Sequence, residues 1–288
     1  MREPMLCQPG KIDSLTSDRW AFETKHDGNR LLIRHDEGKL SLQSRSGRDS
    51  TGDYRLAISS DYTMLLDGEA VSLNRSGVPE FNLIQNRAKT QIEYWAFDIL
   101  ELDGHDLTKM PYRLRREILE KVGQVSTGFH VPPLLDAHTG AKAQALSVDA
   151  GAEGVVAKSW ASFYEFGRRS KNWLKSKNWL EMDVTIGGWK WGTGRREGTI
   201  GSVLVGVPGG DGLRFCGRVG TGFNDSELDR LLSVFQMLQT DRSPFSPRVT
   251  GHDAKGAQWV TPTLTAAVQY GLMTDDGRMR HPSWRGLR

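Results

Sequence analysis

Alternating apolar and polar positions in the first part of the chain predict β-strands joined by tight turns. A short strand at Trp20–Phe22 enters a polar loop. Two further runs, Arg30–Arg34 and Lys39–Ser44, flank the turn residues Asp36–Gly38, so we expect them to form an antiparallel pair. The same pattern predicts two strands, Met64–Leu66 and Glu69–Leu73, on either side of a turn at Asp67–Gly68. A second turn is predicted at Asn74–Gly77, and an aromatic strand at Glu93–Leu100.

The apolar periodicity then changes to the longer repeat that is typical of helices. Pro111–Val122 has a proline in its first turn and places apolar residues at helical spacing, at Leu114, Ile118, Leu119 and Val122. A second helix is predicted at Ala141–Ala150. Two strands are predicted to follow it, Gly154–Lys158 and Trp173–Lys177.

After about Lys177 the sequence becomes rich in glycine and in β-type runs. Strands are predicted at Val184–Trp191, Ile200–Val207 and Leu213–Val219. A helix at Asn224–Leu238 interrupts them, with Asn224 or Asp225 as its N-cap and an inner face of Leu228, Leu231, Leu232 and Phe235. This arrangement favours a small five-stranded barrel with an inserted helix. We therefore place a domain boundary near residues 178–183.

Composition narrows the class of protein. A chain of 288 residues suits one large domain or two medium ones, and 38% hydrophobic with 25% charged residues is typical of a globular protein rather than a disordered or membrane one. No apolar run is long enough to span a membrane, and the charged start at Met1–Pro4 lacks a signal-peptide core, so we expect a cytoplasmic protein. Cys7 and Cys216 lie far apart without metal-ligand spacing, which argues against a disulfide framework or a structural zinc site.

Charge is distributed unevenly along the chain. The formal net charge is only +3, yet residues 155–200 hold nine Lys and Arg against four Asp and Glu, a local net charge of +5. Eight aromatic residues interleave with these cations, at Trp160, Phe163, Tyr164, Phe166, Trp173, Trp179, Trp189 and Trp191. This composition favours a groove for a phosphate backbone. A solvated face over core aromatics is the alternative interpretation.

The chemistry is concentrated in the hexapeptide Lys25–Arg30. It places a lysine on a loop just after a strand, with a carboxylate two residues later, a glycine that lets backbone approach a ligand, and an arginine that opens the next strand. A lysine amine, with an ordinary pKa of about 10.4, is a useful nucleophile only where its surroundings favour the neutral form.

Four further segments carry groups that such a lysine would need. Leu66–Glu69 and Glu153–Lys158 present carboxylates suited to a hard cation such as Mg²⁺. Glu93–Asp98 offers an aromatic face for a base, and Trp173–Lys177 places two lysines on one strand face, which suits a triphosphate. Taken singly, each segment is equally consistent with an ordinary turn, core aromatic or solvated edge.

In order and spacing these segments resemble motifs I, III, IIIa, IV and V of the covalent nucleotidyltransferases, which include ATP-dependent polynucleotide ligases and mRNA capping enzymes. Further segments resemble the ligase domain of the multifunctional bacterial end-joining DNA ligases, at Phe22–Arg30, Ser44–Asp49, Val219–Phe223 and Pro282–Arg288. The resemblance covers essentially the whole chain. The polymerase and phosphoesterase modules often fused to that domain have no counterpart here, so we expect either a stand-alone ligase or an excised domain.

The resemblance implies an α+β fold, with an antiparallel-sheet nucleotidyltransferase (ATP-grasp-like ligase) domain at about residues 1–180 and an OB-fold β-barrel at 181–288. It implies an ATP-dependent DNA ligase that seals nicks between a 5′-phosphate and a 3′-hydroxyl through lysyl-AMP and DNA-adenylate. The implied cofactors are ATP, as AMP donor, and Mg²⁺ or Mn²⁺. The implied partner is nicked duplex DNA held between the domains, with a Ku-like end-binding protein or a polymerase module as further candidates. A monomer without membrane contact is expected.

The resemblance also implies a role for each matching residue. Lys25 would become adenylylated, and Glu23, two positions earlier, would read the adenine side. Phe97 would stack on adenine, while Arg30 and Arg45 would lie near the ribose and the 5′-phosphate of the nick. The resemblance implies three metal-linked carboxylates, Asp27, Glu69 and Glu153, and it also places Glu69 at the ribose. The implied phosphate contacts are Lys158, Lys175, Lys177 and, in a segment that resembles motif VI, Arg280.

Two alternatives stay open at this stage. An RNA ligase or a capping-type guanylyltransferase would share the Lys-x-Asp-Gly loop. A noncatalytic nucleic-acid-binding module with a degenerate pocket is the alternative from another class, and the intact Lys25, Glu69, Glu153 and Lys177 weigh against it. Motif VI of the wider family continues with an acidic residue and a lysine, whereas this sequence stops at Arg288.

Overall fold

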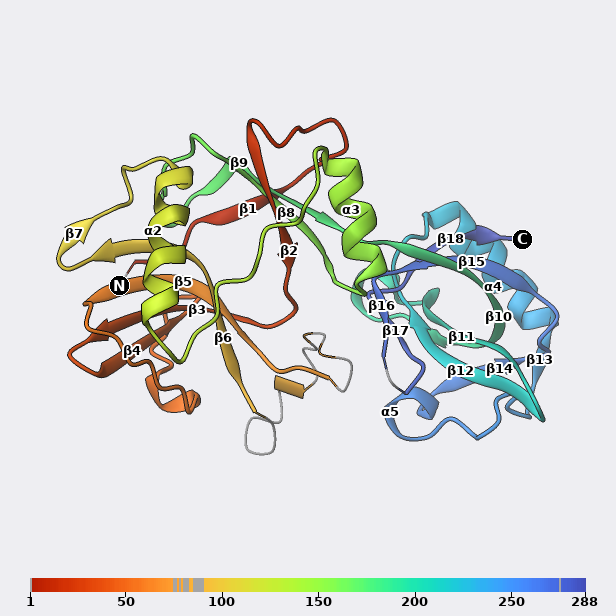
Figure 1. Cartoon of the computed structure of the whole chain (residues 1–288). Coiled ribbons are helices and arrows are strands. Elements are labelled where there is room, and N and C mark those ends of the chain that lie inside the picture. Colours follow the sequence, from red (N-terminus) through yellow and green to blue (C-terminus); the bar gives the residue numbers. More distant parts are fainter. Residues whose placement is uncertain (1, 75–76, 78, 80–82, 85–90, 275) are drawn as a thin grey trace. The chain divides into compact units, whose positions relative to one another are not determined.

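The computed structural model describes residues 2–74, 77, 79, 83–84, 91–274 and 276–288. The chain divides into two compact units, Met1–Asn178 (red to green in Figure 1) and Trp179–Arg288 (green to blue). Of the turn predicted over residues 74–77, the backbone amide of Gly77 donates to the carbonyl of Asn74 at 2.9 Å, whereas residues 75 and 76 lie outside the described residues. Among the helices described, none is long and apolar enough to cross a membrane.

The first unit contains two β-sheets. The four-stranded sheet has the order β1 (Leu6–Pro9), β9 (Arg169–Lys177), β8 (Gly154–Ser159) and β2 (Trp20–Lys25). The five-stranded sheet has the order β4 (Lys39–Ser44), β3 (Asn29–Asp36), β5 (Met64–Val71), β6 (Glu93–Leu102) and β7 (His105–Asp106). Neighbouring strands are antiparallel, except that β1 runs parallel to β9.

The strands predicted at Trp20–Phe22, Arg30–Arg34, Lys39–Ser44, Glu93–Leu100, Gly154–Lys158 and Trp173–Lys177 are confirmed. The turn predicted at Asp67–Gly68 is wrong, because Met64–Val71 is one continuous strand that pairs with β3 and β6, and Gly68 serves close packing against Tyr94 instead of a turn. Strand β1 is an addition that no alternation had indicated.

Apolar side chains fill the space between the two sheets and cover their outer faces. Leu32 of β3 packs with Trp173 of β9 between the sheets, whereas its neighbours Leu31 and Ile33 pack on the opposite face with Leu119 of α2 (Tyr112–Val125). Because both faces of β3 are covered at its centre, its three central residues, Leu31–Ile33, are consecutive apolar residues. The helix α3 (Gly140–Asp149) packs on the outer face of the four-stranded sheet.

Helix α2 turns a different face to the sheet from the one that its leucines predict. Leu114 is 41% exposed, whereas Arg115 is fully buried. The guanidinium of Arg115 donates two parallel hydrogen bonds to Asp98, each 2.8 Å long, and two more to backbone carbonyls. A guanidinium that is paired with a carboxylate and donates from each of its three nitrogens can lie in the interior. The spacing of apolar residues cannot reveal a buried ion pair. The prediction that Leu114 belongs to the buried face of the helix was therefore wrong.

The second unit is a β-barrel built around one long strand. The strand β10 (Leu180–Trp191) pairs along its length with β11 (Ile200–Gly209), β14 (Ala257–Val260) and β15 (Thr265–Tyr270). The sheet is completed by β12 (Gly212–Val219), β13 (Gln239–Thr240) and β18 (Ser283–Leu287). Short elements lie between these strands, at η2 (Gly194–Arg196), α5 (Gly251–Ala254), β16 (Leu272–Met273) and β17 (Met279–Arg280).

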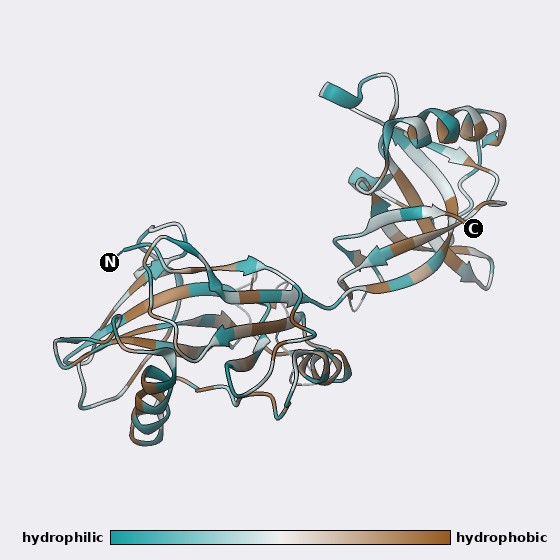
Figure 2. Ribbon diagram, turned by 90° about the horizontal axis from the view of Figure 1, so that it is seen from above, coloured by the Kyte–Doolittle hydropathy of each residue, from teal (hydrophilic) through white to brown (hydrophobic). Residues whose placement is uncertain are grey.

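The helix α4 (Asp225–Met237) begins at Asn224, whose side chain accepts a hydrogen bond of 2.8 Å from the backbone amide of Glu227. Of the two predicted N-caps, Asn224 is therefore the one used. The sheet has seven strands rather than the predicted five, because the strands after α4 are short and give no clear alternation. Figure 2 shows apolar residues along the central strands of each unit and polar residues in the loops.

We expect the buried pair of Arg115 and Asp98 to contribute more to the free energy of unfolding than the more exposed pair of Arg34 and Glu101. Asp98 and Glu101 both lie on β6. Asp98→Ala leaves a buried guanidinium without its partner and should cost about 3–5 kcal/mol in urea unfolding. The control is Glu101→Ala, because Glu101 and its partner Arg34 are 27% and 32% exposed, and its cost should stay below about 1 kcal/mol. Equal costs in the two variants would contradict this assignment.

Candidate active site

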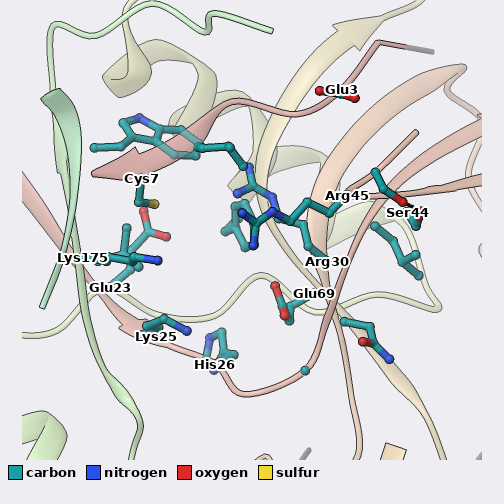
Figure 3. A pocket seen from close by; sticks show the side chains of 18 of the residues that line it. Glu3, Cys7, Glu23, Lys25, His26, Arg30, Ser44, Arg45, Glu69 and Lys175 are labelled. Atoms are coloured by element: carbon teal, nitrogen blue, oxygen red, sulfur yellow. Dashed lines mark hydrogen bonds between the residues drawn. The ribbon is translucent and has the colours of Figure 1, made fainter. Parts of the chain in front are cut away.

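A cavity of about 700 Å³ lies in the first unit, lined by residues of both sheets. Figure 3 shows Glu23, Lys25, Cys7 and Lys175 of the four-stranded sheet on one side of it. The five-stranded sheet and the segment after β4 supply the residues on the other side, which are Arg30, Ser44, Arg45 and Glu69.

The register of β2, β8 and β9 sets the side chains of the first wall in rows. Glu23 lies opposite Val156 in β8, which in turn lies opposite Lys175 in β9. One row further along, Lys25 lies opposite Gly154, which lies opposite Lys177. Because side chains alternate along a strand, segments far apart in the sequence contribute to one surface.

Lys25 ends strand β2, so the strand extends further than Trp20–Phe22 and the lysine is not in the loop. Its Nζ donates a hydrogen bond to Glu153, and the other oxygen of Glu153 pairs with Lys177 Nζ at 2.8 Å. Gly154 allows this close packing, since a Cβ there would lie 2.1 Å from the backbone oxygen of Ser176. Burial acts to raise the pKa of Glu153, but Lys25 and Lys177 outweigh it and hold the pKa below its usual value.

Glu69 of β5 is the carboxylate that lines the cavity opposite Lys25 (Figure 3). It lies across from Arg30 in β3, and Gly28 packs so closely against β5 that an added Cβ would lie 2.2 Å from the carbonyl oxygen of Ala70. Burial raises the pKa of Glu69 to about 7, although Lys25 and Arg30 oppose the shift. Within the described part of the chain, its side chain forms no ion pair or hydrogen bond.

Arg30 is anchored by residues that the sequence analysis missed. Its Nε and one terminal nitrogen donate to the two oxygens of Asp67, at 2.8 and 2.6 Å. Asp67 is fully buried and also accepts a hydrogen bond of 2.6 Å from the Tyr164 hydroxyl. Asp67 was present in the Asp-Gly motif but was interpreted only as a turn residue. It is the central residue of β5 that fixes the Arg30 side chain.

Phe97 lines the cavity from a β-bulge. The pairing of β5 with β6 shifts between Asp67 and Gly68, which are opposite Asp98 and Ala96, so Phe97 is the additional residue. Bulges redirect side chains in this way. The Arg30 guanidinium lies 5.1 Å from the centre of the Phe97 ring, and the ring meets Trp173 edge-on at 6.4 Å.

Lys158 lies deeper than a phosphate-contacting lysine is expected to lie. It is 1% exposed, its Nζ pairs with Glu23 at 2.8 Å, and it donates to the carbonyl of Phe97 at 3.0 Å. Three rings surround the ammonium at 4.4–4.8 Å, those of Phe97, Trp173 and Tyr112. The structure therefore places Lys158 with Glu23 and Phe97, at the end of the site to which the resemblance assigns adenine.

His26 also lines the cavity, although the sequence analysis gives it no role. Its ring meets Trp95 edge-on at 4.5 Å. Burial, together with Lys25 and Lys158, lowers the pKa of His26 to about 4. The imidazole is therefore neutral at physiological pH and adds no charge beside Lys25.

Polar and basic residues contribute a further part of the cavity lining. These residues are Arg45 and Arg48 from the segment after β4, Ser44, Ser46 and Ser50, and Arg169 of β9. Arg169 also donates a hydrogen bond of 2.6 Å to the backbone carbonyl of Cys7. Within the basic stretch, Tyr164, Trp173 and Trp189 are buried and support the core interpretation, whereas Phe163, Trp179 and Trp191 are exposed.

The structure does not bring every predicted site residue into the cavity. Asp27, Glu153 and Lys177 are not among its lining residues, and Arg280 lies in β17 of the second unit. In the residues described, no three His, Cys, Asp or Glu side chains gather where they could hold a metal ion. The three predicted carboxylates thus do not form a ready metal cluster, and Glu69 is the one that faces the cavity.

Comparison with known proteins agrees with this geometry. Residues 4–177 match the family model of the ATP dependent DNA ligase domain, and residues 196–288 match that of the ATP dependent DNA ligase C terminal region. The chain belongs to the ATP-dependent DNA ligase family. The α+β fold class, with a ligase catalytic domain followed by an OB-fold domain, is confirmed, and so is the resemblance to end-joining ligases.

Similar relatives are longer proteins. The chain is 46% identical over 99% of its length to the multifunctional non-homologous end joining protein LigD of Mycolicibacterium smegmatis, of which it spans 38%. It is 32% identical over 93% of its length to the LigD of Pseudomonas aeruginosa, of which it spans 33%. The chain therefore spans about a third of the length of these two relatives.

Solved structures of the family share the architecture. The ligase domain of LigD from M. tuberculosis is 44% identical, with a TM-score of 0.61, full coverage of this chain and 95% coverage of that one. A mycobacterial DNA ligase D solved in complex with ATP and MES has the same identity and coverages, with a TM-score of 0.62. A Lig E DNA ligase at 16% identity and a TM-score of 0.64 shares the fold.

We predict that Glu69 makes the ligase less stable as pH rises. Its folded pKa of about 7 exceeds the ordinary 4.5, so folding takes up a proton between these values and the free energy of unfolding falls as pH increases. Glu69→Gln should therefore gain about 2 kcal/mol relative to wild type between pH 5 and pH 8 in urea unfolding. Glu117→Gln, at an exposed position, is the control and should show a constant difference. A constant difference for Glu69→Gln as well would contradict the shift.

Proposed function

We propose that this ligase seals nicks between a 5′-phosphate and a 3′-hydroxyl in duplex DNA, with Lys25 as the residue that carries AMP. One observation supports this most strongly. Lys25 Nζ is held at the wall of a cavity that is also lined by the aromatic ring of Phe97 and by the cations Arg30, Lys158 and Lys175. We further propose that residues 1–180 form the adenylation domain and residues 181–288 the OB-fold domain.

The cavity has a complementary group for each part of ATP. At one end, Phe97 offers a ring for stacking, and Glu23 and Lys158 offer an acceptor and a donor to the edge of a base. Arg30 and Glu69 face the middle, where the ribose would lie. Lys25 and Lys175 supply positive charge for the phosphates. In the described residues Lys175 pairs with no carboxylate, so a phosphate group would provide its counter-charge.

In the first step, the amine of Lys25 attacks the α-phosphorus of ATP and the bond to pyrophosphate breaks. This forms a phosphoramidate between Nζ and AMP. Attack requires that Nζ lose a proton, and Glu153 is the acceptor that Nζ already contacts. Lys175 and Lys177 extend the same strand face and would balance the charge that develops on the leaving pyrophosphate.

In the second step, an oxygen of the 5′-phosphate at the nick attacks the same phosphorus, and Lys25 leaves as the amine. In the third step, the 3′-hydroxyl attacks the activated 5′-phosphate, AMP departs, and the phosphodiester forms. We propose that Arg45 and Arg48, which line the cavity, hold the 5′-phosphate during both transfers. Because every step builds charge on non-bridging oxygens, one basic cavity can serve all three.

A divalent cation, Mg²⁺ or Mn²⁺, fits this site at Glu69. The Glu69 carboxylate lines the cavity, burial raises its pKa to about 7, and it is the donor type that hard cations prefer. Such an ion would supply charge neutralisation on the phosphate oxygens. Asp27 and Glu153 would join it only through water or after moving, since Glu153 pairs with two lysines.

The role of this ligase in the cell is inferred from its relatives. Since they are end-joining proteins in name, we propose a role in DNA repair, with a Ku-like protein or a polymerase module as candidate partners. The DNA ligase families matched do not favour an RNA ligase, a capping enzyme or a noncatalytic module. We also propose that the ligase acts on DNA as a monomer in the cytoplasm. Arg280 of the second unit is proposed to contact the pyrophosphate only during the first step.

The proposal predicts that Lys25→Ala and Lys25→Arg both abolish protein-bound, acid-labile label from α-labelled ATP. Alanine removes the amine, and arginine stays protonated and presents no lone pair. Lys121→Ala, at an exposed position of α2, is the control and should label as wild type does. The measurement is labelling followed by denaturing separation. Label retained in either Lys25 variant would exclude Lys25 as the carrier.

A further inference from the structure

The carboxylate of Glu23 is held by two partners at the base end of the cavity. Glu23 lies on β2 two residues before Lys25, lines the cavity and is only 3% exposed. One of its oxygens accepts a hydrogen bond from the Tyr112 hydroxyl, and the other pairs with Lys158 Nζ at 2.8 Å. A carboxylate held through both of its oxygens is an acceptor with a fixed direction.

Tyr112 is itself held rigidly. It is the first residue of α2 and is fully buried, and its backbone amide donates to the carbonyl of Ser162 at 2.8 Å. Its ring stacks on Trp160 at 5.8 Å with an interplanar angle of 19°, and meets Trp173 edge-on at 6.3 Å. Burial and the adjacent Glu23 raise the pKa of Tyr112 well above its usual value, so the hydroxyl keeps its proton.

Lys158 alone would leave the carboxylate free to turn. Its ammonium is shared between Glu23 and the carbonyl of Phe97, and an ammonium is a point charge that imposes little direction. The Tyr112 hydroxyl adds the second fixed point, and two points on different oxygens define the plane of the Glu23 carboxylate. The hydroxyl oxygen also lies 3.5 Å from the carbonyl oxygen of Phe97, the longer of its two contacts.

We propose that Tyr112 is a positioning residue for nucleotide selection, which orients the Glu23 carboxylate to accept a hydrogen bond from the 6-amino group of a purine. This rests on the proposed function, in which ATP charges Lys25. An adenine amino group donates to an acceptor at that place, whereas the 6-oxo group of guanine would face a second acceptor and be repelled. Tyr112 touches neither the base nor the reacting atoms and acts through Glu23.

The test compares ATP with purine riboside 5′-triphosphate, which lacks the 6-amino group, in single-turnover formation of the protein-bound adenylate. Wild type should prefer ATP, and Tyr112→Phe should reduce the ratio of the two kcat/KM values about tenfold, because a hydrogen bond to a charged group is worth roughly that much. The change should lie mainly in KM for ATP, since the base is remote from the transferred phosphorus.

Tyr94→Phe is the matched control, since it also removes a buried hydroxyl, one that donates at 3.0 Å to the carbonyl of Leu31. It should leave the nucleotide preference unchanged. Equal loss with both nucleotides in Tyr112→Phe would make Tyr112 merely structural and overturn the proposal. A wild-type enzyme that uses the two nucleotides equally would also overturn it, whether or not the variant folds. Wild-type labelling by ATP reports separately on the proposed function.

Discussion

The site depends on charge pairing within each of the two sheets of the first unit. Lys25, Lys158 and Arg30 line one cavity, and each of them is held by a carboxylate. Lys25 shares Glu153 with Lys177, Lys158 pairs with Glu23, and Arg30 pairs with Asp67. These pairs keep the basic side chains in place without a ligand. Lys175 and Arg45 line the same cavity, and within the residues described they pair with no carboxylate. The cavity is therefore suited to receive an anionic ligand that supplies the missing charge.

Strand register turns separated motifs into one surface. Lys25, Gly154 and Lys177 come from three strands and lie in one row, and the glycine keeps the row close enough for Glu153 to contact both lysines. The motifs identified in the sequence were sufficient to name most of these residues, because each motif carries its charged residue at a strand end or at alternating positions. The same spacing placed Lys175 on the cavity wall.

Other features could not be predicted from local pattern. The bulge at Phe97 depends on how β5 and β6 pair, and a single sequence does not reveal a pairing shift. The depth of Lys158 depends on rings contributed by three distant segments. The roles of Asp67 and Tyr112 follow from side chains that meet only in the folded protein. In the second unit, the short strands after α4 owe their pairing to the barrel and not to alternation.

We propose that the Lys25 amine, which donates a hydrogen bond to Glu153, is the group that receives AMP. Peptide mass spectrometry of the wild-type protein after reaction with ATP, with digestion kept away from acid, tests this claim directly because it locates the adenylate on one residue. We expect this measurement to find AMP on Lys25. Adenylate found on Lys158, Lys175 or Lys177 instead would contradict it, and would mean that the pairing of Lys25 with Glu153 serves the fold and not the reaction.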